Sequence, residues 1–310
     1  MVSASRNSPV LGISLKVASV AVFLSMATLL KATPGVPSGE LVFFRSFFGL
    51  VPVLAWLTYR RELREGMKTT HLKGHLARGS VGTLSMMLGF FALTQLPLPE
   101  STTLGYAMPL LIVVFSAVFL HEVVRLYRWS AVAIGFVGVV IIAWPSLTLF
   151  TNGVSNSAAL GVAASLGFAS LGAVAQLLVR RLTETERSAT IVFYFLASSA
   201  VISLVTLPFG WVMPTPQQAL FLVLAGFCGG VAQILLTESY RHADMSVIAP
   251  FEYTSLILSV AVGYLVFHDV PTWQMIVGGL IVVGSGLFIL WREQRLGRTR
   301  PEEKVVTPQG

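Results

Sequence analysis

The chain has 310 residues, of which 55% are hydrophobic and only 11% are charged, less than half the ~25% charged residues of an average soluble domain. Its mean hydropathy is +0.78. So little polar surface cannot coat so much apolar side chain, which excludes a soluble enzyme and a disordered chain. The single cysteine, Cys228, excludes a disulfide framework and a cysteine-built zinc site.

Ten apolar segments are long enough to cross a bilayer, because ~20 helical residues span ~30 Å of hydrocarbon. Backbone groups find no water there, so each segment must be helical. The first segment has a short basic flank, Arg6 and Lys16, but lacks a convincing small-residue cleavage site, so it is expected to remain as a helix. The predicted spans are residues 12–30, 40–58, 77–95, 101–120, 129–147, 158–179, 189–208, 217–238, 246–266 and 272–291.

Basic residues gather in every second loop and in the C-terminal tail. They are Arg60, Arg61, Arg64, Lys68, Lys73, Arg78, Arg125, Arg128, Arg180, Arg181, Arg187, Arg241, Arg292, Arg295, Arg298, Arg300 and Lys304. The alternate loops contain only Lys31. Because Lys and Arg accumulate on the cytoplasmic side, both termini are predicted to be cytoplasmic. The net charge of +7 is thus a topology signal, and no nucleic-acid partner is expected.

The two halves of the chain share short motifs in the same order. Leu120-His121-Glu122-Val123 follows the fourth segment and Phe267-His268-Asp269-Val270 the ninth, and Tyr106 matches Tyr253 at the same offset. Five segments per half is an odd number, so the second half must enter from the opposite side. We therefore predict an all-α membrane protein of ten transmembrane helices in two inverted five-helix repeats, residues 1–150 and 151–293. A cytoplasmic polar tail, residues 294–310, follows them. Inverted repeats are typical of secondary transporters.

Several further motifs accompany this pattern. They are Glu40-Leu41-Val42-Phe43-Phe44-Arg45, Leu96-Pro97-Leu98-Pro99-Glu100, Pro109, Phe119-Leu120-His121-Glu122, Ala249-Pro250-Phe251-Glu252-Tyr253, Phe267-His268-Asp269-Val270-Pro271 and Trp291-Arg292-Glu293. Together they resemble the drug/metabolite transporter superfamily, in particular its EamA-domain family, over residues 10–293. The resemblance implies a carrier that exports amino acids or imports metabolites such as riboflavin or S-adenosylmethionine. The family's usual Gly-Glu after the fourth segment is replaced by His121-Glu122, at a loop position.

Ionisable residues inside a bilayer are costly and therefore functional candidates, and two stand out in the predicted spans. Arg45 is interpreted as a ligand for a substrate carboxylate or phosphate; the alternatives are snorkelling to the headgroups or a pair with Glu40. Glu252 is interpreted as an ammonium ligand or a titrating proton carrier; the alternative is a structural hydrogen bond. Because their segments enter from opposite faces, we expect the two charges to differ in depth by roughly 10 Å and to form no direct ion pair.

Other polar groups complete the candidate substrate or coupling site. Tyr106 and Tyr253 are expected to line a cavity, and Pro109 and Pro250 to kink their helices. The intramembrane glutamines are further candidates, with hydrogen bonding between helices as the alternative; they are Gln95, Gln176 and Gln233. Gly226 and Gly230 form a GxxxG pair for close helix packing.

No metal or cofactor is expected. His71 and His75 are four residues apart, but they are assigned to a basic loop that repels cations, and no HExxH pattern is present. A Walker A sequence is also absent, so ATP does not drive this chain directly. The expected partners are a small-molecule substrate, the lipid bilayer, and a proton or a counter-substrate.

These features predict a secondary transporter of a small polar organic metabolite that works by alternating access. An amino acid or related zwitterion is the preferred substrate, with export favoured. The alternative is an importer of a vitamin or nucleoside-like metabolite such as riboflavin or S-adenosylmethionine, and a remote alternative is an intramembrane enzyme or scaffold. In a Gram-negative host the expected location is the inner membrane.

Overall fold

The computed structural model describes residues 9–121, 124–148, 157–243 and 245–298, and these residues contain helices and no strand. The predicted tail beyond residue 298, the loop 149–156 and Glu122 with Val123 lie outside the described residues. Among the described residues, ten helical segments are long and apolar enough to cross a membrane. The predicted ten-helix membrane fold is therefore confirmed.

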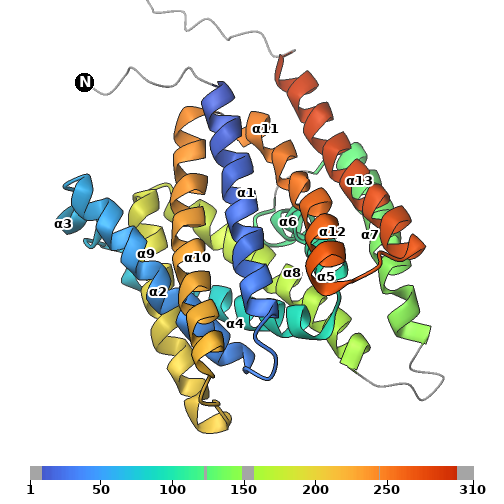
Figure 1. Ribbon diagram of the computed structural model, residues 1–310. Coiled ribbons are helices and arrows are strands. Elements are labelled where there is room, and N and C mark those ends of the chain that lie inside the picture. The colour runs from blue at the N-terminus through green and yellow to red at the C-terminus, as the bar shows by residue number, and fades with distance from the viewer. Residues whose placement is uncertain (1–8, 122–123, 149–156, 244, 299–310) are drawn as a thin grey trace, which may run out of the picture.

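Seven spans are single helices (Figure 1). They are α1 (Pro9–Lys31), α2 (Ser38–Tyr59), α4 (Leu72–Gln95), α7 (Leu126–Thr148), α8 (Ser157–Leu182), α10 (Pro216–His242) and α13 (Trp273–Arg298). Three spans are composite: α5 (Leu98–Gly105) with α6 (Ala107–Phe119), α9 (Ser188–Ser203) with the 3₁₀ helix η2 (Leu204–Phe209), and α11 (Met245–Ile248) with the 3₁₀ helix η3 (Ala249–Tyr253) and α12 (Thr254–Phe267). The short α3 (Leu63–Gly66) lies between the second and third spans.

The third span begins earlier than predicted. α4 starts at Leu72 rather than at residue 77, so His75 belongs to a helix and not to a basic loop, and Arg78 lies nearly two turns inside that helix. His75 is buried, and its Nε2 lies 3.8 Å from the Glu186 carboxylate. Polar residues at a helix start resemble a loop in the sequence, but here His75 faces protein rather than water.

The fourth and ninth spans are interrupted close to prolines. α5 ends at Gly105, and Pro109 has no N–H to donate to the carbonyl four residues earlier. Pro250 lies in η3, where α-helical bonding gives way to 3₁₀ geometry. Each interruption ends on a tyrosine, Tyr106 in one half and Tyr253 in the other.

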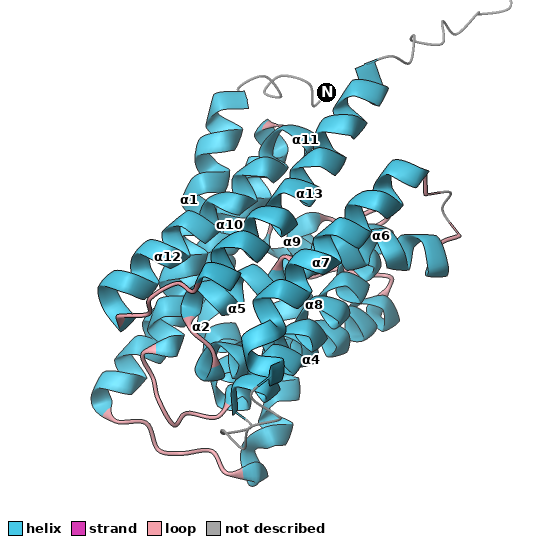
Figure 2. Cartoon of the chain, turned by 90° about the vertical axis from the view of Figure 1, so that its right-hand side faces the viewer, coloured by secondary structure: helices cyan, strands magenta, loops and turns pink. Residues whose placement is uncertain are grey.

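Helix packing repeats between the halves. α1 packs along α10, which joins the first span to the eighth, and α8 packs along α4, which joins the sixth to the third. α7 and α13, the fifth and tenth spans, lie side by side at one edge of the molecule (Figures 1 and 2). Moving each span to its counterpart in the other half turns the contact between spans 1 and 8 into the contact between spans 6 and 3, and it turns the contact between spans 5 and 10 into itself. Two inverted five-helix repeats require this symmetry.

Glycines allow two helices to approach closely near the centre. A Cβ built on Gly230 of α10 would lie only 2.4 Å from the carbonyl oxygen of Gly49 in α2, and one on Gly226 would lie 2.7 Å from the Phe44 carbonyl. The GxxxG pair of α10 therefore packs against α2 backbone to backbone. This contact joins the two halves beside the buried Arg45.

Candidate functional site

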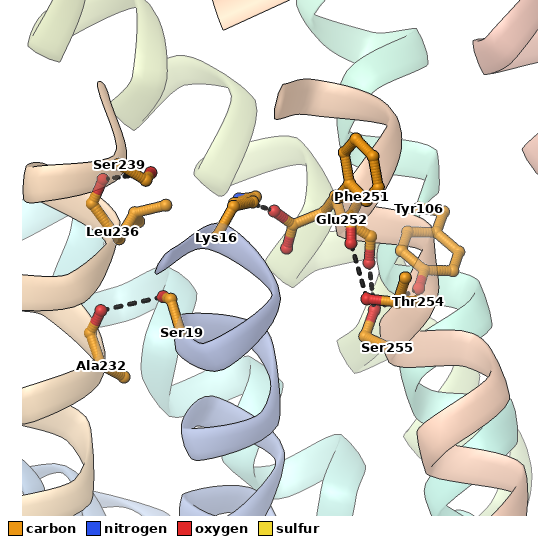
Figure 3. A network of polar contacts seen from close by, with 10 residues as sticks. All are labelled: Lys16, Ser19, Tyr106, Ala232, Leu236, Ser239, Phe251, Glu252, Thr254 and Ser255. Carbon is orange, nitrogen blue, oxygen red and sulfur yellow. Dashed lines mark hydrogen bonds and ion pairs between the residues drawn. The ribbon is translucent and has the colours of Figure 1, made fainter. Parts of the chain in front are cut away.

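An ion pair connects the first span to the ninth (Figure 3). The Lys16 ammonium of α1 donates to the Glu252 carboxylate of η3. The Lys16 side chain is 5% exposed, whereas that of Glu252 is 52% exposed. The pair thus has one buried partner and one that solvent or a ligand can reach. Lys16 was assigned to the basic flank of the first span, but it lies about two turns inside α1.

Two tyrosines lie beside this ion pair and bring the two helix interruptions together. The rings of Tyr106 and Tyr253 meet edge to face with centroids 5.1 Å apart. The Tyr106 hydroxyl is hydrogen-bonded to the Ser255 hydroxyl, which also donates to the Glu252 carbonyl at 2.7 Å (Figure 3). The geometry therefore offers a cation, a carboxylate and aromatic surface in one place.

Arg45 belongs to a separate cluster in the interior. Its side chain passes over Gly229 of α10, and its guanidinium carbon lies 5.7 Å from the centroid of the Phe195 ring in α9. The residue is 5% exposed, which excludes snorkelling. The predicted alternative partner, Glu40, instead accepts a hydrogen bond from the Val212 N–H at 3.1 Å.

A second arginine faces the same ring. The Arg78 guanidinium carbon lies 4.0 Å from the Phe195 centroid. For both arginines, Nε and Nη1 are buried and have no hydrogen-bond partner in the described part of the chain. Sequence reasoning did not select Arg78 as a site residue, because it was counted among the basic residues that mark the cytoplasmic loops. Its place as the second residue of the predicted span 77–95 was the signal available.

At the other end of α1, a second ion pair again joins the first and ninth spans. The Lys31 ammonium lies 3.7 Å from the Asp269 carboxylate and donates to the Leu96 carbonyl at 2.5 Å. Asp269 in turn accepts a hydrogen bond from the Leu98 N–H at 3.1 Å. Lysines near both ends of α1 therefore bind acidic residues at opposite ends of the ninth span.

The three candidate glutamines do not join either cluster. Gln95 is the last residue of α4, and its amide donates to the neighbouring Thr94 hydroxyl at 3.1 Å. Gln176 is exposed on α8, and Gln233 is half-buried on α10. The candidate site residues that come together are thus Glu252, Tyr106 and Tyr253.

The loop before α4 contacts the loop before α9 through a hydrogen bond from Thr69 to Glu186. They border a pocket of about 470 Å³ that includes Lys68, Thr69, Glu186 and Arg187. Burial opposes ionisation of Glu186, but the Thr69 hydroxyl at 2.6 Å and the nearby His75 outweigh it and hold the pKa of the carboxyl below its usual value. Glu186 is thereby committed to structural contacts.

Comparisons with known proteins agree with this architecture. The chain is 26% identical over 258 residues to an S-adenosylmethionine uptake transporter of Rickettsia bellii, covering 83% of this chain and 85% of the relative. It is 29% identical over 283 residues to a riboflavin transporter of Vibrio cholerae, covering 90% and 92%. It is also 29% identical over 278 residues to a pseudopaline exporter of Pseudomonas aeruginosa, covering 88% and 93%.

A solved crystal structure that is 20% identical superposes on 93% of this chain and on all of the solved chain with a TM-score of 0.65, so the two share a fold. The model of the EamA-like transporter family matches twice, over residues 10–144 and 156–291. The chain therefore belongs to the EamA-like transporter family and is a multi-pass membrane transporter of the drug/metabolite type.

Proposed function

We propose that the chain transports an amino acid or a related zwitterion, with export as its working direction. The observation that carries this proposal is the Lys16–Glu252 ion pair, whose carboxylate is half exposed. A zwitterion brings a carboxylate and an ammonium, and these can replace Glu252 at Lys16 and Lys16 at Glu252. Binding then separates the protein pair, and each of its two charges keeps a partner.

The two ion pairs of α1 suggest how access alternates. With both termini in the cytoplasm, Lys16 and Glu252 lie towards the inside and Lys31 and Asp269 towards the outside. Separation of the first pair frees α1 from η3 on the inner side, while the second pair holds it near the end of α12. Closure of the inner pair and separation of the outer pair complete a cycle of rocking between the repeats.

A vitamin or nucleoside-like metabolite is the second candidate substrate, with import as its direction. The edge-to-face Tyr106–Tyr253 pair favours it, because a flat heterocycle stacks well on aromatic surface. Relatives named as riboflavin and S-adenosylmethionine transporters point the same way. S-adenosylmethionine combines a zwitterionic end with a heterocycle, so it would use both the ion pair and the tyrosines.

Coupling to a proton would use Glu252. Glu252→Gln keeps the size of the side chain and removes its titratable group. If Glu252 carries the coupling proton, transport driven by a pH gradient stops in this variant while exchange of substrate across the membrane continues. Unchanged gradient-driven transport by a folded Glu252→Gln protein would instead assign coupling to a counter-substrate.

The substrate class can be tested in proteoliposomes that contain only this protein. Each amino acid of a radiolabelled panel is compared with its deaminated acid and its decarboxylated amine, alongside riboflavin and S-adenosylmethionine. We expect saturable transport of at least one zwitterion and at least tenfold weaker transport of its two analogues. Lys16→Gln should remove the preference over the amine, and Glu252→Gln the preference over the acid. Glu184→Gln, at an exposed loop position, is the matched control; equal transport of all three forms would contradict the proposal.

A further inference from the structure

The Arg45 and Arg78 guanidinium groups form a second cluster of charge in the membrane interior. They come from α2 and α4 of the first half and meet on Phe195 of α9 in the second half. Arginine keeps its proton under all physiological conditions, so neither residue can relieve its burial by becoming neutral. In the described part of the chain, neither forms an ion pair with a carboxylate.

The Phe195 ring compensates only part of this charge. A phenyl face attracts a cation but neither neutralises it nor accepts hydrogen bonds in the plane of the guanidinium. Nε and Nη1 of both arginines remain buried donors without acceptors. A donor set of this kind, one arginine buried and the other half-buried, favours an anion that enters from outside the chain.

Glycines make room for both guanidinium groups. A Cβ on Gly229 of α10 would lie 3.2 Å from Arg45 Nε, and a Cβ on Gly82 of α4 would lie only 2.0 Å from Arg78 Nη1. Any other residue at position 82 would therefore displace the Arg78 guanidinium. The position of this side chain depends on local backbone geometry as well as on the phenyl ring.

We infer that Arg45 and Arg78 together bind a ligand group with two negative charges, either a dicarboxylate or a phosphate monoester. A single negative charge would leave one of the two positive charges uncompensated. Both guanidinium carbons lie within 6 Å of one ring centroid, so they are no more than about 10 Å apart. A four-carbon dicarboxylate spans this distance when each carboxylate forms a bidentate pair, and a phosphate monoester bridges a shorter one.

This site is distinct from the Lys16–Glu252 site of the proposed function. The position of a Cβ on Gly229 is close to both Arg45 and Met26, and Met26 lies ten residues beyond Lys16 in α1, or ~15 Å along the helix. The two inferences therefore concern different residues and different ligands. Failure of the zwitterion proposal would leave the anion site in place, and the reverse also holds.

Ligand pairs that differ by one negative charge test the inference. Succinate is compared with succinamate, and methyl phosphate with dimethyl phosphate, at pH 7.5. Apparent affinities come from the ligand-induced shift in the thermal unfolding midpoint of the detergent-purified full chain. We expect the doubly charged member of at least one pair to bind at least tenfold more tightly than its partner, since one charge-assisted contact is gained. The pair that shows this preference identifies the ligand as dicarboxylate or phosphate monoester.

Variants locate the effect. Arg78→Met should abolish the preference for the second charge, so that both members of a ligand pair bind about equally. Gly82→Ala should reduce the preference while retaining both arginines. Arg181→Met removes an exposed arginine at the end of α8 and should leave the preference unchanged. If Arg78→Met does not fold, Gly82→Ala and the wild-type preference still decide the question. A wild-type preference below threefold for both pairs, or the same preference in wild type and in the folded Arg78→Met or Gly82→Ala protein, would overturn the inference.

Discussion

Removal of either partner of the Lys16–Glu252 ion pair should lower stability, but by unequal amounts. Glu252→Ala leaves a lysine side chain that is 5% exposed without its acceptor, whereas Lys16→Met leaves a carboxylate that is 52% exposed and can be hydrated. Breaking a fully buried pair costs ~3–5 kcal/mol. The exposure of Glu252 reduces this to about 2–3 kcal/mol for Glu252→Ala. For Lys16→Met we expect less than ~1 kcal/mol, because methionine fills the same apolar space.

Thermal unfolding of the purified protein in one detergent, followed by tryptophan fluorescence, measures this difference. Each kcal/mol lowers Tm by about 2–4 °C for a chain of this size. Glu252→Ala should therefore lower Tm by roughly 4–12 °C and Lys16→Met by less than about 4 °C. The double variant Lys16→Met/Glu252→Ala should recover most of the loss, since no unpaired charge is left. Equal losses in the two single variants, or a double variant as unstable as Glu252→Ala, would refute the reasoning.

Three further predictions follow from other parts of the molecule. Arg45→Lys keeps the charge and loses the planar fork, so it should weaken binding of an anionic ligand ~10–100-fold and leave an analogue without the anionic group unaffected; equal losses for both would remove Arg45 from any binding site. Gly230→Val should lower the Tm and the yield of folded protein, because its Cβ collides with α2, whereas Gly284→Val should not, because a Cβ there meets no atom within 4 Å beyond its own stretch of helix; similar effects at both would contradict the close helix contact. In a cysteine-free background, cysteine at Lys68 should be labelled only from the cytoplasmic side and cysteine at Gln217 only from outside, and labelling of both from one side would end the topology argument.

The spans could be predicted from the sequence because hydrophobicity and length alone decide whether a helix crosses a bilayer. The start of α4 could not. His71, Lys73, His75 and Arg78 give this stretch the composition of a basic loop, and only contacts with distant residues bury part of it. The contact between His75 and Glu186 joins residues more than one hundred positions apart, which no local pattern records.

Arg45 and Glu252 could be selected because a charge inside a bilayer is costly wherever it lies. Their surroundings could not be predicted. Lys16 and Arg78 were assigned to the cytoplasmic flanks of their spans, since basic residues near helix ends usually serve topology. The surroundings of the glutamines could not be predicted either, because an amide inside a span can bond locally or remain at the surface, as Gln95 and Gln176 do.

Saturable transport in proteoliposomes that contain only this protein tests the central claim most directly. The measurement is the uptake or efflux of a labelled zwitterion beside its deaminated and decarboxylated analogues, in wild type and in the Lys16→Gln and Glu252→Gln variants. We predict saturable transport of the zwitterion, at least tenfold weaker transport of both analogues, and loss of one preference in each variant. Absence of saturable transport of any panel member, or a preference that neither variant alters, would contradict the account.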